Sequence, residues 1–406
     1  MNSISPFAPE TEYQPLPVSG VRFATHSCGL KDSGGDDLLL VALPEGTAVA
    51  GVFTRSSTAA APVDACRANL PLGVARALIV HSGNANAFTG KMGEAVVWET
   101  SAAIADIFGC SPRMVYSAAT GIIGRSFSPE KIVSHLVDLA GRLDANGGAA
   151  AARTIMTTDT FPKSTSRKVA TSQGNIVLTG LAKGAGMIAP DMATLLSFVF
   201  TDAKIAPTDL QRSLNVANQK SYSKISVDGD TSTNDTLLLF ATGQSTAETL
   251  SGADLAVFTE ALTDLLKELA LLIVRDGEGI TKFIKVDVNG ARTDAEALSA
   301  ARAIAGSPLV KTAIAGGHPN WGRIIMAVGK SGATVNKRNM SVNLGGIPVA
   351  RSGDPVAHNR DEDLNAHMGG REIHIEVDLA AGTASDTVYT CDLTYGYVEI
   401  NAFYKT

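Results

Sequence analysis

The stretch KGAGMIAPDMATLLSFVF, residues 183–200, constrains the fold more than any other part of the chain. Two glycines and a proline in its first half indicate a turn, and the apolar run in its second half indicates a buried strand. Thr194 stands at the junction, directly after the small residue Ala193. The fold must therefore place a hydroxyl group where a tight turn enters a buried strand.

Two interpretations of this stretch involve no covalent chemistry. In the simpler one, the glycines form a turn and Thr194 is an ordinary β-branched strand residue. The other is a dinucleotide-binding loop, because Gly184, Gly186 and Ala189 satisfy the pattern G-x-G-x-x-A. That loop requires a helix that begins within the glycines, and Pro190 interrupts any such helix. The dinucleotide interpretation is therefore rejected.

A third interpretation gives the Thr194 hydroxyl a chemical role. If this hydroxyl attacks the carbonyl group of Ala193, the peptide bond between them breaks and Thr194 becomes a new N-terminus. A free α-amine has an ordinary pKa of about 7.7 to 8.0, so it can accept the hydroxyl proton near neutral pH without a histidine. A constrained turn at Pro190 favours cleavage by straining this peptide. One residue would then supply both nucleophile and base.

Acyl transfer also needs hydrogen-bond donors for the negative charge that develops on the carbonyl oxygen. Thr120 and Gly121 follow the apolar run MVYSAA, so a hydroxyl and a backbone amide can point to one spot at the end of a strand. An ordinary turn is the alternative at this position. The stretch MTTDTFPK adds hydroxyl groups that could cap a helix or line a pocket: Thr157, Thr158 and Thr160.

Composition limits the classes of function. The chain has 406 residues, 45% of them hydrophobic and 18% charged, which indicates a well-buried folded protein with two structural units. A net charge of -6 without a basic run argues against a nucleic-acid partner. Charged residues interrupt the longest apolar run, 253–274, and the N-terminus has no apolar signal segment. We therefore expect no membrane association, and small molecules are the expected partners.

The cysteines also carry information about location and metals. Cys28, Cys66, Cys110 and Cys391 are scattered without C-x-x-C spacing, which argues against a zinc site and against a disulfide framework. Such thiols suit the reducing cytoplasm, so a cytoplasmic location is expected. No spacing typical of metal ligands occurs among the seven histidines either.

Apolar periodicity predicts alternating strands and helices. Near Thr281 the pattern changes to pairs of strands with intervening helices, which indicates a domain boundary. Residues 1–281 are expected to form one domain and 282–406 a smaller α+β domain. An Ala/Gly cluster at 146–153 is expected to be a loop that leads into a helix. Strands are predicted at 37–44, 47–54, 75–83, 195–203, 283–291 and 340–350, with a hairpin at 166–180. Helices are predicted at 91–109, 128–143, 208–222, 253–274 and 294–306.

Five stretches together closely resemble the ornithine acetyltransferase family, also called glutamate N-acetyltransferases. They are KGAGMIAPDMATLL, AATGIIG, MTTDTFPK, RDGEG and the terminal NAFYKT. The resemblance runs from about residue 10 to Thr406. It implies an α/β fold of the N-terminal-nucleophile-like type, layered α/β/β/α, with a C-terminal tail that returns to the active site. It also implies self-cleavage into an α chain, 1–193, and a β chain that begins at Thr194, assembled as α2β2.

The resemblance assigns roles to individual residues. Thr194 matches the nucleophile, Ala193 the end of the α chain, and Thr120 with Gly121 the oxyanion pair. The residues that match substrate contacts are Thr157, Lys183, Thr194, Glu278, Asn401 and Thr406. A lysine suits a substrate carboxylate and a glutamate suits an ammonium group. The adjacent Thr158 leaves the assignment of Thr157 open.

The implied reaction is ping-pong acetyl transfer from N-acetylornithine to glutamate through acetyl-Thr194. It implies neither a metal nor an organic cofactor, which agrees with the lack of metal-ligand spacing among the histidines. Some members of the family also use acetyl-CoA as donor, and no residue in this chain decides that point. Two alternatives stay open: a self-processed aminopeptidase or amidase, in which water takes the acyl group, and an uncleaved, non-catalytic binding protein.

Overall fold

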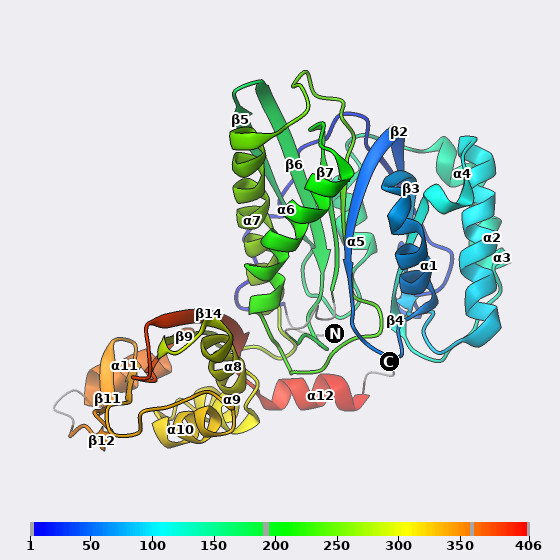
Figure 1. Ribbon diagram of the computed structural model, residues 1–406. Helices are drawn as coiled ribbons and strands as arrows, with labels where there is room; N and C mark the ends of the chain where they lie inside the picture. Colours follow the sequence, from blue (N-terminus) through cyan, green and yellow to red (C-terminus); the bar gives the residue numbers. More distant parts are fainter. Residues whose placement is uncertain (1–3, 190–194, 358–360, 404–406) are drawn as a thin grey trace.

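The computed structural model describes residues 4–189, 195–357 and 361–403. Within them, eight strands form one sheet of order β4-β3-β2-β8-β7-β6-β5, with β1 paired to β2 (Figure 1). These strands are β1 (Arg22–His26), β2 (Leu38–Phe53), β3 (Val74–Asn84), β4 (Val115–Ile122), β5 (Lys163–Thr171), β6 (Gly174–Lys183), β7 (Leu196–Thr201) and β8 (Thr236–Ala241). The helices that accompany them are α1 (Ala61–Asn69), α2 (Gly90–Phe108), α3 (Glu130–Val133), α4 (Leu136–Gly141), α5 (Gly148–Thr154), α6 (Pro207–Gln219) and α7 (Gly252–Val274).

The long strand β2 belongs to both halves of this sheet. Its first part, 38–42, pairs with β1 and β3, and its last part, 48–53, pairs with β8. The register against β3 shifts between Ala42 and Thr47. Bulges bend a strand and increase its twist. The sequence predicted two strands here, at 37–44 and 47–54, and the structure joins them into one.

The two halves of the sheet pack face to face. Phe23 of β1 and Phe200 of β7 meet edge to face with ring centroids 5.4 Å apart, and Phe200 stacks on Phe240 of β8 at 5.5 Å. One buried cluster joins these rings with the alternate side chains Leu39 and Val41 of β2. Because side chains alternate between the two faces of a strand, the neighbouring residues of β2 point outward. The inner layers are therefore two sheet halves with a shared apolar core.

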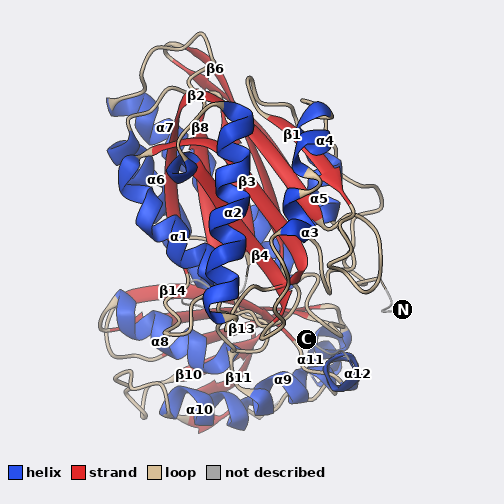
Figure 2. Ribbon diagram, turned by 90° about the vertical axis from the view of Figure 1, so that its right-hand side faces the viewer, coloured by secondary structure: helices blue, strands red, loops and turns tan. Residues whose placement is uncertain are grey.

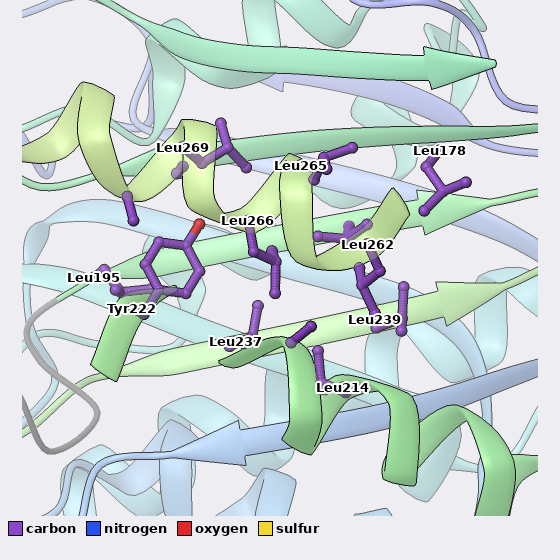
Figure 3. Close-up of a cluster of buried hydrophobic side chains, with 14 of the residues drawn as sticks. Leu178, Leu195, Leu214, Tyr222, Leu237, Leu239, Leu262, Leu265, Leu266 and Leu269 are labelled. Atoms are coloured by element: carbon purple, nitrogen blue, oxygen red, sulfur yellow. The ribbon is translucent and has the colours of Figure 1, made fainter. Parts of the chain in front are cut away.

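Helices cover both outer faces. On one side, α7 and α6 pack over the half formed by β5 to β8, where Leu262 and Leu266 of α7 face Leu237 and Leu239 of β8 (Figure 3). On the other side, α2, α3 and α4 pack on outward-facing side chains of β2 and β3, among them Leu40. The four layers confirm the α/β/β/α fold class expected from the sequence.

Two predictions about helices were wrong. The segment 128–143 was expected to be one helix and is two, α3 and α4. The Ser134 hydroxyl donates to the Glu130 carbonyl at the break, and such back-bonding bends helices. The cluster at 146–153 was expected to be a loop and forms α5, because its alanines favour helix and their small side chains fit between the sheet halves.

The six strands from β9 onward form a second sheet of order β12-β11-β10-β13-β9-β14 in the described part of the chain. Figure 2 shows this sheet and its helices below the sandwich. Its strands are β9 (Phe283–Ala291), β10 (Ser341–Leu344), β11 (Ile347–Arg351), β12 (Asp354–Pro355), β13 (Glu372–Asp378) and β14 (Ala384–Cys391). Its helices are α8 (Asp294–Ala305), α9 (Pro308–Ala315), α10 (Trp321–Gly329) and α11 (Asp361–Gly369).

The last helix, α12 (Tyr395–Phe403), runs along the lower edge of the sandwich next to the second sheet unit (Figure 1). Gly279, which follows α7, lies against it so closely that an added Cβ atom would be 2.3 Å from the Tyr397 nitrogen. Among the helices that the structure describes, none is both long enough and apolar enough to cross a bilayer.

Candidate active site

The loop that carries the predicted cleavage bond connects two neighbouring strands. Lys183 ends β6, Leu196 begins β7, and the two residues are register partners in the antiparallel pair. Ala193 and Thr194 lie outside the described residues, as does Thr406. The described residues on either side of the loop show where it leaves and re-enters the sheet.

Thr120 and Gly121 lie at the end of β4, beside the end of β3. Gly121 pairs with Gly83 and has a φ of +130°, a conformation that L side chains rarely adopt. A Cβ atom on Gly121 would be 2.3 Å from the carbonyl carbon of Gly83. Only glycine fits this position, and the close approach of the two strands fixes the backbone next to the Thr120 hydroxyl.

Lys183 brings three of the predicted site residues together. Its ammonium group donates to Thr157 Oγ1 at 2.8 Å and to Thr120 Oγ1 at 3.2 Å. The side chain is almost completely buried, and burial lowers its pKa while the charge of Asp159, 4.0 Å away, opposes that change. Because the lysine is the donor in both bonds, each hydroxyl hydrogen is free to point elsewhere.

A buried ion network supports Lys183 from below. The Lys163 ammonium group lies 2.7 Å from Asp159 and 2.6 Å from Asp276, and all three side chains are inaccessible to solvent. Asp159 also accepts the backbone N–H groups of Gly184 and Thr157. Although burial alone would raise it, the charges of Lys163 and Lys183 hold the pKa of Asp159 below its usual range.

The pKa of Asp276 shifts in the opposite direction from that of Asp159, although both carboxylates contact Lys163. Burial and the neighbouring charge of Asp159 raise the pKa of Asp276, and Lys163 lowers it only in part. The lysine thus compensates Asp159 more completely than Asp276. Two buried carboxylates beside one ammonium group make a network that depends on the presence of Lys163.

Glu278 and Asn401 form a second polar pair. The Asn401 amide donates to Glu278 Oε2 at 2.7 Å, which connects the turn after α7 to helix α12. Burial raises the pKa of Glu278, while hydrogen bonds from Asn401 and Thr158 lower it. Gly186 lies directly against the carboxylate: a Cβ atom there would be 2.4 Å from the carboxylate carbon. The glycine in the loop therefore makes room for Glu278.

Thr157 and Thr158, between which the sequence left the substrate contact open, have different hydrogen-bond partners. Thr157 accepts a hydrogen bond from Lys183, and Thr158 hydrogen-bonds to Glu278. A cavity of about 1240 Å³ begins at Thr158 and Glu278 and continues between α12 and the turn at Gly279. Both hydroxyl groups thus border the polar region, one near the cationic end and one near the anionic end.

Sequence reasoning missed several residues that organise this site. Lys163 and Asp276 received no role, although a charged residue next to an apolar strand or helix was visible at both positions. Asn234 donates from Nδ2 to the carbonyl groups of Ala85 and Ala119, and so ties the segment before β8 to the end of β3 and to β4, the strand that carries Thr120. The available signal was the polar sequence STND directly before the apolar strand TLLLFA.

Asp235 is the fourth missed residue. Its carboxylate is completely buried at the start of β8, and Oδ1 accepts the Leu195 N–H at 3.1 Å. Burial raises the pKa of Asp235 well above its usual range, and the Leu195 N–H and the Lys183 charge lower it only in part. Within the described residues, no group of three His, Cys, Asp or Glu side chains is arranged to hold a metal ion.

A layered α/β/β/α protein with this buried set of hydroxyl, ammonium and carboxylate groups falls into the class of acyl-transferring enzymes. Residues 22–406 match the ArgJ family model. The chain belongs to the ArgJ family.

Known proteins resemble the chain over its whole length. It is 47% identical to the arginine biosynthesis bifunctional protein ArgJ of Rhizobium meliloti, over 100% of this chain and 99% of that protein. The protein of the same name from Ruegeria pomeroyi is 46% identical, with the same coverage. The crystal structure of ArgJ from Bacillus halodurans is 42% identical, with a TM-score of 0.48, and the match covers 50% of this chain and 96% of that chain.

Proposed function

We propose that this chain is a self-cleaving acetyltransferase of arginine biosynthesis that moves an acetyl group from N-acetylornithine to glutamate through acetyl-Thr194. Membership of the ArgJ family and the names of its full-length relatives support the pathway and the enzyme class. The observation that carries the proposed substrates is the pair of opposite charges at one site. Lys183 suits a substrate carboxylate, and Glu278 with Asn401 suits an amino-acid ammonium group.

The proposed first half-reaction begins at Thr194. Its α-amine takes the hydroxyl proton, and Oγ1 bonds to the acetyl carbon of N-acetylornithine. The Thr120 hydroxyl and the Gly121 N–H donate to the oxygen that becomes negative. Lys183 supports this role because it donates to Thr120 Oγ1, which leaves the Thr120 hydrogen available for the oxyanion. The new ammonium group then protonates the ornithine amine as the bond to carbon breaks.

In the second half-reaction, the amine of glutamate attacks the acetyl group on Thr194. The same oxyanion donors act again, and a proton returns from the incoming amine through the α-amine to Thr194 Oγ1. Both substrates carry an amino-acid group, so one set of contacts can bind each in turn. Thr157, Lys183, Glu278, Asn401 and Thr406 form this set in the proposal. Acetyl-CoA as a second donor belongs to the same proposal, because the relatives are named bifunctional.

The proposal extends to organisation. Cleavage yields α (1–193) and β (194–406) chains, proposed to assemble as α2β2. Residues 178–183 of β6 in the α chain pair with all of β7 in the β chain, which supports their staying together after cleavage. A boundary at 281/282 agrees with the start of the second sheet at β9. The four cysteines are free thiols, which supports a reducing, cytoplasmic location.

The decisive experiment compares the wild-type enzyme with Thr194→Ala. We expect the variant to stay as one polypeptide in denaturing electrophoresis and to lose acetyl transfer. Mass spectrometry of the wild-type enzyme after brief exposure to N-acetylornithine should show an acetyl group on the first residue of the β chain. A Thr194→Ala protein that still matures into two chains and transfers acetyl groups at the wild-type rate refutes the proposal.

Hydrolysis is the alternative reaction for the same nucleophile. N-acetylornithine turnover with and without glutamate separates the two, since transfer yields N-acetylglutamate and hydrolysis releases acetate at a rate that glutamate does not change. The buried cation of Lys183 beside a second, anionic subsite at Glu278 favours transfer between two amino acids.

A further inference from the structure

The carboxylate of Asp235 has one oxygen with a partner and one without. Oδ1 accepts the Leu195 N–H at 3.1 Å. Oδ2 is buried and has no hydrogen-bond partner in the described parts of the chain. A buried carboxylate oxygen without a partner is costly, so a second donor for it is expected.

The position of Asp235 follows from strand pairing. Thr236 of β8 and Leu196 of β7 are partners in a parallel pair, and the Thr236 N–H donates to the Leu195 carbonyl. Asp235 therefore lies beside Leu195 at the same end of the sheet. The backbone carbonyl of Asp235 also accepts the Thr54 N–H, which fixes this residue to the strand end of β2.

Covalent geometry connects Asp235 to the proposed nucleophile. The Leu195 nitrogen that Asp235 holds belongs to the peptide bond between Thr194 and Leu195. Three covalent bonds separate it from the Thr194 nitrogen, so the two nitrogens are within about 4 Å of one another in any conformation. A donor that appears on the Thr194 nitrogen thus arises within about 4 Å of the nitrogen that Asp235 binds.

We infer that Asp235 is a positioning residue whose free oxygen receives the α-ammonium group that self-cleavage creates on Thr194. This inference rests on the proposed function. Before cleavage the Thr194 nitrogen is an amide with one hydrogen and no charge. After cleavage it is an amine, and the ammonium form appears each time it takes the hydroxyl proton. Asp235 transfers no electron pair itself; it orients the amine and stabilises its protonated form.

The surroundings of Asp235 contain little competing charge. Among the described residues, Lys183 is the charged side chain that acts on the Asp235 carboxyl, and Lys183 also binds Thr120 and Thr157. Burial favours the neutral carboxyl in the uncut chain. A new ammonium group at hydrogen-bond distance favours the ionised form instead, so maturation itself charges this residue.

The test is the pH dependence of kcat/KM for N-acetylornithine in Asp235→Asn. In the free mature enzyme the acidic limb of that profile reports the pKa of the Thr194 amine. A neighbouring carboxylate raises the pKa of an ammonium group by about 1 to 3 units. We therefore expect the limb of Asp235→Asn to move to lower pH by about 1 to 3 units, while the asparagine oxygen still accepts the Leu195 N–H.

Asp202→Asn is the matched control. Asp202 follows the far end of β7, is also buried although less completely than Asp235, and accepts a strand amide, the Val177 N–H at 2.8 Å. Its substitution should leave the acidic limb in place. An unmoved limb in Asp235→Asn overturns the inference, and so does an equal shift in both variants.

Chemical rescue covers the case in which Asp235→Asn does not mature. Asp235→Ala leaves space for a small carboxylate, and we expect formate, but not formamide, to restore cleavage and acetyl transfer. No response to formate, or equal rescue by both compounds, overturns the inference. Thr194→Ala separates a failure of this inference from a failure of the proposed function. If Thr194→Ala is uncut and inactive while substitution of Asp235 has no effect on the acidic limb, only the role of Asp235 fails and the proposed function stands.

Discussion

Lys163 is a fully buried lysine whose ammonium group lies between two carboxylates on different elements. Asp159 comes from the segment before β5 and Asp276 from the turn after α7. Asp159 in turn holds the Gly184 N–H at the start of the cleavage loop. One side chain therefore links the loop, the hydroxyl cluster and the turn that carries Glu278.

Lys163→Met should destabilise the protein by about 3–5 kcal/mol at pH 7, because both buried carboxylates lose their counter-charge. The pKa of Asp159 is depressed in the folded protein, so its stabilising contribution is present above the ordinary pKa of about 3.9 and is lost as pH falls. In the variant the largest lowering effect is gone, and the weaker effects of Lys183 and the Gly184 N–H remain. The difference in the free energy of unfolding should therefore be smaller at pH 3, below the ordinary pKa of Asp159, than at pH 7.

Urea unfolding at both pH values measures this difference. The control is Lys168→Met, a substitution of an exposed lysine on the same strand, which should change stability by less than about 0.5 kcal/mol. A Lys163→Met protein that is as stable as wild type at pH 7 would contradict the assigned network.

At the scale of elements, the site is built where strands and turns end. The ends of β3 and β4 approach so closely that two glycines face one another, and this fixes the oxyanion turn. The sequence predicted the strand and the turn at Thr120 and Gly121, because an apolar run followed by a glycine is a local pattern in the sequence. It could not predict the contact with Gly83, which depends on how two parallel strands align.

Gly121→Ala should reduce kcat by about 100-fold, because the new Cβ atom would overlap the Gly83 backbone and displace the amide proposed to bind the oxyanion. Steady-state kinetics and thermal unfolding measure the two effects. Gly124→Ala is the control: Gly124 also has a positive φ, +79°, but no atom lies within 4 Å of an added Cβ. It should cost about 1–2 kcal/mol of stability and leave kcat unchanged. Equal kcat values for the two variants would contradict the role of Gly121.

At the scale of the whole molecule, the site lies where the sandwich, the second sheet unit and α12 meet. Asn401 reaches Glu278 across 123 positions of sequence, and Tyr397 on the same helix donates to Asp228. Asp228 accepts the N–H groups of Met187 and Ile188 in the cleavage loop. The C-terminal helix is thus connected to both the substrate-binding carboxylate and the loop that is cut.

Gly279→Ala tests this connection without replacing any residue that is proposed to contact the substrate. The added Cβ atom would lie 2.3 Å from the Tyr397 nitrogen, so α12 must shift and carry Asn401 away from Glu278. We expect KM for N-acetylornithine to rise about tenfold, as for the loss of a hydrogen bond to a charged group. Gly252→Ala, with a φ of +52° and open space around it, is the control. A Gly279→Ala enzyme with wild-type KM would show that α12 does not position the site.

The sequence by itself determined many of the strands and helices from local apolar patterns, and the family with its layered fold class from contiguous motifs. It missed α5 and the break between α3 and α4. The strand after the cleavage loop, the long helix α7 and the hydroxyl stretch at 156–160 were all visible without coordinates. The tertiary structure alone decided which charges meet. Lys163 with Asp276, and Asp235 with Leu195, are 113 and 40 positions apart, and only the packing of helix on sheet and strand on strand brings them within hydrogen-bond distance.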